Sequence, residues 1–263
     1  MALAVPSRPL SAVQPAWLLV AAAIASQIVY PLLPDGPRTE ITVASVVLFF
    51  LAAVADVIRV HGARGALLLV TIAGGGGLLA EAIGVQTGFP FGAYAYSGSL
   101  GPQLLGVPVV IPLACVMMAW PALVVARTLA KRPSAVVAVG ALALTAWDVF
   151  LDPQMVAAGH WTWTHPDPAL PLVPGIPLTN YLGWLLVTTV IMAALHTTLP
   201  PHDRTSGPAA ALYLWVYFSS VMAHFVFFGL PGSAVMGAIV MGAIAIPFLL
   251  VLVRRRAREL EQP

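Results

Sequence analysis

Long apolar runs without a charge are the feature that most constrains this chain. Runs approaching or exceeding about 18 uncharged residues are typical of membrane spans. Only 8% of the 263 residues are charged, against roughly 25% in an ordinary soluble domain. The runs are continuous instead of alternating with polar residues, which favours helices over a barrel. The predicted fold class is therefore all-α, a polytopic integral membrane bundle of about eight transmembrane helices.

Eight segments have about the ~20 residues needed to cross ~30 Å of hydrocarbon. Proline and glycine residues mark the breaks between them. There is no clear soluble domain and no defensible internal repeat, so residues 1–263 are expected to form a single transmembrane domain. The predicted spans are Ala16–Leu33, Ile41–Ile58, Gly65–Val85, Val107–Ala126, Ser134–Leu151, Tyr181–Leu199, Ala209–Phe228 and Ser233–Val253.

The basic residues orient this bundle. With the N-terminus inside the cell, eleven of the twelve lie on the cytoplasmic side, and only Arg38 falls outside. Cytoplasmic loops carry an excess of Lys and Arg, so both termini are expected to be cytoplasmic. The eleven are Arg8, Arg59, Arg64, Arg127, Lys131, Arg132, Arg204, Arg254, Arg255, Arg256 and Arg258.

Two long connections, 86–106 and 152–180, are extracytoplasmic under this topology, and residues 254–263 form a short basic cytoplasmic tail. Both loops lack Lys and Arg and are rich in Gly, Pro and aromatic residues. They are either ordinary loops with aromatic anchors at the membrane interface or segments folded back over a site. The chain has no basic face that could follow nucleic-acid phosphates. A lone cysteine, Cys115, allows no thiolate metal site.

Ionisable residues within spans are costly and therefore candidates for function. Asp56 lies three residues before Arg59, so a local ion pair explains it, and it is left out of the site. Glu81, Asp148, Asp152 and His224 all fall at similar depth in the outer half of the bilayer. A polar group satisfied by its neighbours would explain any one of them, but their common depth favours a shared site.

Spacing adds detail to this set. Asp148 and Asp152 are four residues apart, on one helix face and about 6 Å apart along the axis. Two carboxyls so placed in a medium of low dielectric should not both ionise readily, so one is expected to hold a proton. A glycine stripe flanks Glu81, at Gly77, Gly84 and Gly88. It permits either tight helix packing or a slot for a slender ligand.

The two long loops supply aromatic residues without basic ones. Ring faces stabilise positive charge, so such a lining suits an apolar or transiently cationic guest. A neutral carboxylic acid can protonate a C=C bond to give a tertiary carbocation, onto which a neighbouring carboxylate directs water. These residues therefore indicate chemistry on an unsaturated lipid. The aromatic residues are Phe89, Phe91, Tyr94, Tyr96, Trp161 and Trp163.

Four motifs stand out over about residues 75–200: GFPFGAYAY at 88–96, Gly106-Val107-Pro108, WDVFLDPQMVAAGHWTW at 147–163 and GIPLTNYLGW at 175–184. In these motifs the sequence resembles the carotenoid biosynthesis membrane family, whose characterised members are CruF-type carotenoid hydratases, including the bisanhydrobacterioruberin hydratases. The pair Ala114-Cys115 departs from the family, where an aromatic residue is expected early in the fourth span, and this leaves the particular carotenoid open.

The resemblance implies addition of water, without a cofactor or metal, across the terminal double bond of an acyclic carotenoid. The implied partners are an apolar carotenoid within the membrane, the lipid bilayer and other carotenoid biosynthesis enzymes. The protein itself is expected to be a multi-pass protein of the cell membrane. From the residues and the resemblance together, Glu81, Asp148 and Asp152 are the catalytic candidates. The substrate-binding candidates are Phe91, Tyr94, Tyr96, Trp161, Trp163, Asn180 and His224.

Three other functions remain open at this stage. Asp148-x-x-x-Asp152 matches half of an Asp-rich magnesium motif, as in a prenyltransferase, but diphosphate transfer would need a second such pair and basic residues around the phosphates. A carotenoid cyclase would share the protonation step. A non-catalytic carotenoid binder or lipid transporter is the alternative from another class, although a transporter would be expected to show inverted repeats.

Overall fold

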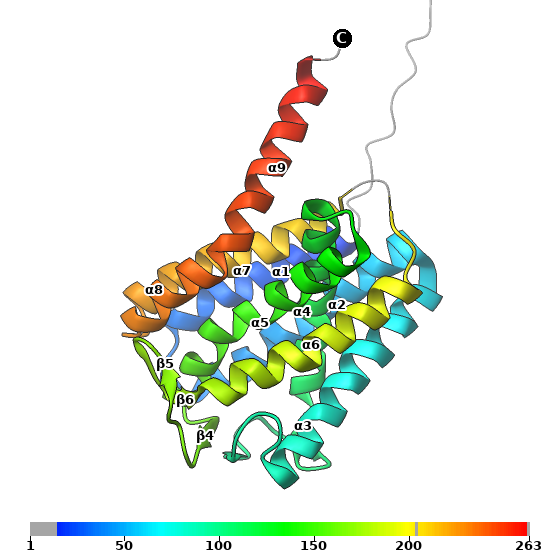
Figure 1. Cartoon of the computed structure of the whole chain (residues 1–263). Helices are drawn as coiled ribbons and strands as arrows, with labels where there is room; N and C mark the ends of the chain where they lie inside the picture. The colour runs from blue at the N-terminus through cyan, green and yellow to red at the C-terminus, as the bar shows by residue number, and fades with distance from the viewer. Residues whose placement is uncertain (1–14, 203–204, 262–263) are drawn as a thin grey trace, which may run out of the picture.

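The computed structural model describes residues 15–202 and 205–261 as a bundle of helices (Figure 1). In these residues the short strands lie in the two long connections and just after the first of them, where β3 takes up the first two residues of the fourth predicted span. The helices account for the apolar runs of the sequence. The helices are α1 (Pro15–Val29), η1 (Tyr30–Leu32), α2 (Asp35–Leu69), η2 (Val70–Gly75), α3 (Gly76–Thr87), α4 (Val110–Leu129), α5 (Pro133–Ala157), α6 (Leu178–Thr198), α7 (Gly207–Val226), α8 (Pro231–Val240) and α9 (Gly242–Glu261).

Six of the helical segments are long and apolar enough to cross a membrane, or seven if the bent pair α8 and α9 is one span. The prediction of a helical, multi-pass membrane protein is therefore confirmed, whereas the count of eight stays a prediction. The difference comes from the second and third predicted spans, which lie within one helical stretch of 52 residues, Gly36–Thr87.

Gly62 interrupts this long stretch. Its backbone is non-helical, with φ 71° and ψ −177°, a conformation that only glycine adopts without strain. A straight helix of that length would extend for about 78 Å, more than twice the ~30 Å of a hydrocarbon core. Counting the parts before and after Gly62 as separate spans would give the predicted number.

The eighth predicted span, Ser233–Val253, is divided between α8 and α9, whose axes differ by 52°. Figure 1 shows α9 extending away from the other helices. Its last turns carry Arg254, Arg255, Arg256 and Arg258. The predicted basic tail is thus the continuation of a helix up to Glu261, and its last two residues, together with Arg8 and Arg204 of the orientation argument, lie outside the described residues.

Orientation is open to a direct test. If the N-terminus is cytoplasmic, a reporter fused at Ser99 should read as extracytoplasmic and one fused at Lys131 as cytoplasmic, because α4 separates the two positions. Paired alkaline phosphatase and fluorescent protein fusions would give this measurement. Identical readings at the two positions would contradict the predicted topology.

The core of the bundle is built around α4. In this helix 78% of the most apolar stretch is buried, against 61% in α5 and 22–39% in the other candidate spans. α4 packs against α2, α5 and α7, and its residues Met118, Ala119 and Leu123 are fully enclosed.

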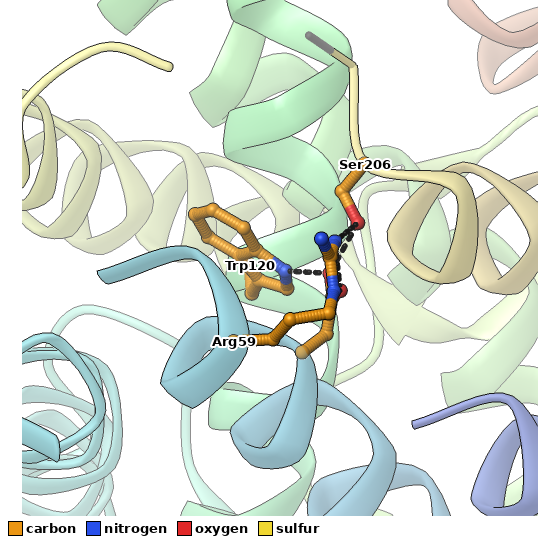
Figure 2. Close-up of polar contacts among 4 residues, drawn as sticks. Arg59, Trp120 and Ser206 are labelled. Atoms are coloured by element: carbon orange, nitrogen blue, oxygen red, sulfur yellow. Dashed lines mark hydrogen bonds and ion pairs between the residues drawn. The ribbon is translucent and has the colours of Figure 1, made fainter. Parts of the chain in front are cut away.

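Asp56 is fully buried and ties three parts of the bundle together. The Arg59 guanidinium lies 2.7 Å from its Oδ1, which confirms the predicted local ion pair. Trp120 of α4 donates to Oδ2 at 2.7 Å, and the Ser206 hydroxyl donates to the same oxygen. Figure 2 shows Arg59, Trp120 and Ser206 directed toward one another. Because a buried carboxylate is stable only when paired and hydrogen-bonded, this cluster is structural.

Candidate active site

The two long connections fold against each other as a small antiparallel ribbon. β1 (Tyr94–Tyr96) pairs with β4 (Trp161–Trp163), with Tyr94 opposite Trp163 and Tyr96 opposite Trp161. Alternate residues of a strand face the same side, so these four aromatic side chains lie together, whereas Ala95 and Thr162 are exposed on the other side. In Figure 1, β4 lies at the same end of the bundle as α3. The connections thus form a cover over that end, as one of the two interpretations of the loops proposed.

The remaining strands complete this cover. β2 (Gln103–Leu104) pairs with β3 (Val107–Pro108), and β5 (Ala169–Leu170) pairs with β6 (Val173–Pro177). His160 precedes β4, and its Nδ1 shares a hydrogen bond with Ser99 Oγ at 2.7 Å. Burial lowers the pKa of His160, so the ring is neutral at pH 7 and joins the two connections without adding charge.

Glu81 of α3 lies beneath this aromatic ribbon and is buried. The Tyr96 hydroxyl donates to Glu81 Oε2 at 2.8 Å, and the Tyr94 hydroxyl donates to the same oxygen. Burial, and then the neighbouring Glu81, raises the pKa of both tyrosines well above the ordinary value. The phenols therefore keep their protons, and the two donors hold the Glu81 carboxyl in one position.

The glycine stripe on α3 explains how the ribbon approaches Glu81 so closely. A Cβ on Gly84 would lie 2.6 Å from the Phe91 ring and 2.8 Å from the Tyr94 hydroxyl, and one on Gly77 would lie 2.6 Å from Cys115 Sγ. The space beside these glycines is filled by the protein's own side chains, which is the packing interpretation of the stripe. Gly88 has another role: it ends α3 in the left-handed conformation, with φ 76°.

Asp148 and Asp152 lie on the same face of α5 and are both buried. The sequence placed Asp152 at the exit of the fifth span, which was expected to end at Leu151, but α5 continues to Ala157. Asp152 is therefore inside the helix. Asn180, in the first turn of α6, donates to Asp152 Oδ2 at 2.6 Å. Within residues 15–202 and 205–261, no group donates a hydrogen bond to Asp148, so neither oxygen of its carboxyl has a donor there.

All three carboxyls face one small cavity of about 50 Å³. This volume leaves room for a few water molecules. The aromatic ribbon supplies one wall, and α4, α5 and α6 supply the others. The lining consists of Glu81, Tyr94, Tyr96, Ile111, Ala114, Cys115, Leu144, Trp147, Asp148, Leu151, Asp152, Trp161, Trp163, Asn180, Trp184, Thr188 and Ile191.

The lining includes residues that the sequence argument did not select. Trp147 and Trp184 lie within the motifs WDVFLDP and GIPLTNYLGW, beside Asp148 and close to Asn180 respectively, so position in a motif was the available signal. Ala114 and Cys115, the pair expected to differ from the family, also line the cavity. Two small side chains therefore stand where an aromatic ring would narrow the space.

Two predicted substrate-binding residues do not line this cavity. His224 hydrogen-bonds through Nδ1 to Ser233 Oγ at 2.7 Å and contacts the rings of Phe150 and Phe228 edge-on. The His224 ring therefore faces α8. The sequence argument missed this because depth in the bilayer gives a residue's height on a helix but not the direction in which its side chain points. Phe91 lies behind the lining, 4.8 Å from the Trp184 ring, and its carbonyl accepts a hydrogen bond from Trp163 Nε1. Phe91 thus supports the aromatic wall from outside.

Comparison with known proteins assigns the chain to a protein family. Residues 41–253 match the family described as carotenoid biosynthesis protein, and the chain belongs to that family. The resemblance seen in the motifs is thereby confirmed.

A curated relative is more specific. The chain is 36% identical over 115 residues to a protein named bisanhydrobacterioruberin hydratase from Haloarcula japonica. The matched segment covers 42% of this chain and only 38% of that relative, so the chain aligns with less than half of its length. No solved structure matches the chain.

Proposed function

We propose that this protein is a carotenoid hydratase of the cell membrane, adding water to the terminal C=C bond of an acyclic carotenoid. The observation that carries the proposal is the convergence of Glu81, Asp148 and Asp152 on a water-sized cavity walled by aromatic rings. Membership of the carotenoid biosynthesis family supports the substrate class, and the hydratase relative supports the reaction.

In the first step, the acid is Asp148. Its carboxyl lacks a donor among the described residues and shares the cavity with two other carboxyls, an arrangement in which one of them retains a proton. The O–H bond breaks and the π electrons of the alkene form a C–H bond at its less substituted carbon. The other carbon becomes a tertiary cation, and the faces of Trp161, Trp163 and Tyr94 stabilise its charge.

In the second step, a water in the cavity forms the C–O bond to the cation and loses a proton to Glu81. Tyr94 and Tyr96 hold Glu81 in place for this task. Transfer of that proton from Glu81 to Asp148 through cavity water restores both groups, so the net change is the addition of one water. Asp152 is fixed by Asn180, and its role is to keep a proton on its neighbour Asp148. No cofactor or metal takes part in this scheme.

Cyclisation would share the first step but needs the cation to be captured by a second double bond instead of water. The small, carboxyl-lined cavity favours capture by water. Diphosphate transfer would need acidic metal ligands, and over residues 15–202 and 205–261 no group of three or more His, Cys, Asp or Glu is arranged to hold a metal ion. A non-catalytic carotenoid binder would not require three buried carboxyls, which are costly to keep inside a membrane protein.

Expression in a host that makes lycopene tests the proposal. We expect new carotenoids heavier than lycopene by one water, or by two if both ends react, with tertiary hydroxyl groups. Extracts from cells carrying an empty vector provide the control, and mass spectrometry of the separated pigments is the measurement. Unchanged pigments, with the protein present in the membrane, would favour a binder; an isomer of unchanged mass would favour a cyclase.

A further inference from the structure

A second and larger cavity adjoins the acid cavity. Its volume is about 390 Å³, against about 50 Å³ for the first. It forms a groove between α1, η1 and α2 on one side and α4, α5 and α7 on the other. Most of its lining is apolar or aromatic, including Tyr30, Phe150, Trp215 and Phe228.

The groove has an open and a closed end. Leu32 and Met222, which line it, are 68% and 53% exposed on the outside of the bundle, where apolar side chains face the lipid. At the other end, Phe150 and Trp161 are only 1% and 6% exposed. The groove therefore runs from the lipid-facing surface, between η1 and the end of α7, toward the centre of the protein.

The closed end of the groove is a wall of the acid cavity. Five residues line both spaces: Ile111, Ala114, Trp147, Leu151 and Trp161. One of the five, Ala114, carries only a methyl group. A molecule lying in the groove thus reaches the carboxyls by passing these side chains, without crossing the aromatic ribbon.

We propose that this groove binds the polyene chain of the carotenoid, which enters sideways from the bilayer and presents its terminal double bond to the acid cavity at Ala114, Trp147 and Trp161. The inference rests on the proposed function and adds where the substrate lies. The acid cavity is small, about 50 Å³, whereas the groove is large and apolar and is separated from it only by shared side chains. A long apolar polyene is the occupant that matches a lipid-facing opening and aromatic walls.

Pigment retention tests this assignment independently of catalysis. In an Asp148→Asn background, expressed in lycopene-making cells, substrate cannot be consumed, and the pigment that co-purifies reports binding. Ser219 lies on the groove face of α7 and is half-buried, so Ser219→Trp should block the groove. We expect roughly tenfold less lycopene per protein, equivalent to about 1.4 kcal/mol of binding.

Val226→Trp is the matched control, because Val226 is on the same helix, 66% exposed and outside the groove lining. It should retain lycopene at the level of the Asp148→Asn parent. Ala223→Leu fills the groove less and should give an intermediate loss, which guards against failure of the tryptophan variant to fold. Thermal unfolding of each purified variant, followed by tryptophan fluorescence, checks the fold.

The outcomes separate the groove from the reaction. Equal lycopene on Ser219→Trp and Val226→Trp, or none on the parent, would overturn the groove assignment even if the wild-type protein hydrates lycopene. Loss of co-purified phospholipid from Ser219→Trp, with lycopene unchanged, would also overturn it and make the groove a lipid site. Groove-dependent lycopene binding by a protein that never forms a hydrated product would support the groove and refute the proposed hydratase.

Discussion

Asp148→Asn is expected to lower hydration at least about 100-fold, the lower bound of what a positioned general acid contributes. Asparagine keeps the shape of the side chain and its capacity for hydrogen bonds, but it cannot transfer a proton to an alkene. The described residues donate no hydrogen bond to Asp148, so replacing its carboxyl with an amide should disturb little structure. The measurement is the yield of hydrated carotenoid per amount of membrane protein.

Asp167→Asn is the control for this change, because Asp167 is exposed in a loop away from the cavity. Asp152→Asn provides the internal comparison. Its hydrogen-bond partner is Asn180, and two amides can still pair, so the protein should still fold. Activity should fall, because asparagine cannot help to keep a proton on Asp148. If Asp148→Asn and Asp152→Asn both keep wild-type yields, the pair is structural and the acid lies elsewhere.

Glu81→Gln is expected to have an effect nearly as large, again about 100-fold, since the base that accepts the proton of water is removed. The glutamine carbonyl oxygen can still accept from the tyrosines, so the position of the side chain should be retained. Product yield and thermal stability should be measured together. A large fall in yield with an unchanged unfolding temperature is the expected pattern.

Two further variants test whether Glu81 acts directly. Glu40→Gln, at an exposed position of α2, should leave the yield unchanged. Tyr94→Phe removes one donor to Glu81 but keeps the ring, so it should cost less than Glu81→Gln. A Tyr94→Phe loss larger than that of Glu81→Gln would indicate that the phenol itself is the reacting group.

The class of fold and most of the site could be predicted from the sequence, because each depends on position along a helix. Uncharged runs fix where the chain is inside lipid, and depth placed Glu81 level with Asp148. Spacing placed Asp148 and Asp152 on one helix face. These arguments need only the rise of a helix per residue and the period of its faces.

The features that could not be predicted depend on the rotation of each helix about its axis and on pairing between segments distant in sequence. Depth did not reveal that His224 faces α8 and Ser233. The apolar run that defined the fifth span did not show that α5 would continue past Asp152. The register that brings Tyr94 opposite Trp163 arises from two connections that are far apart in sequence, and neither is a strongly patterned strand by itself.

The short separation of Glu81 and Asp152 from their hydrogen-bond partners has a consequence for how the chain is made. A carboxyl inserted into lipid alone is unfavourable, and the hydrogen-bond partners of Glu81 come after it in the chain. Those partners follow only 13 and 15 residues later, and the partner of Asp152 follows 28 residues later. During synthesis these two side chains therefore need only a short further length of chain before their partners are present. The order of the segments itself limits how long either acid stays without a hydrogen-bond donor.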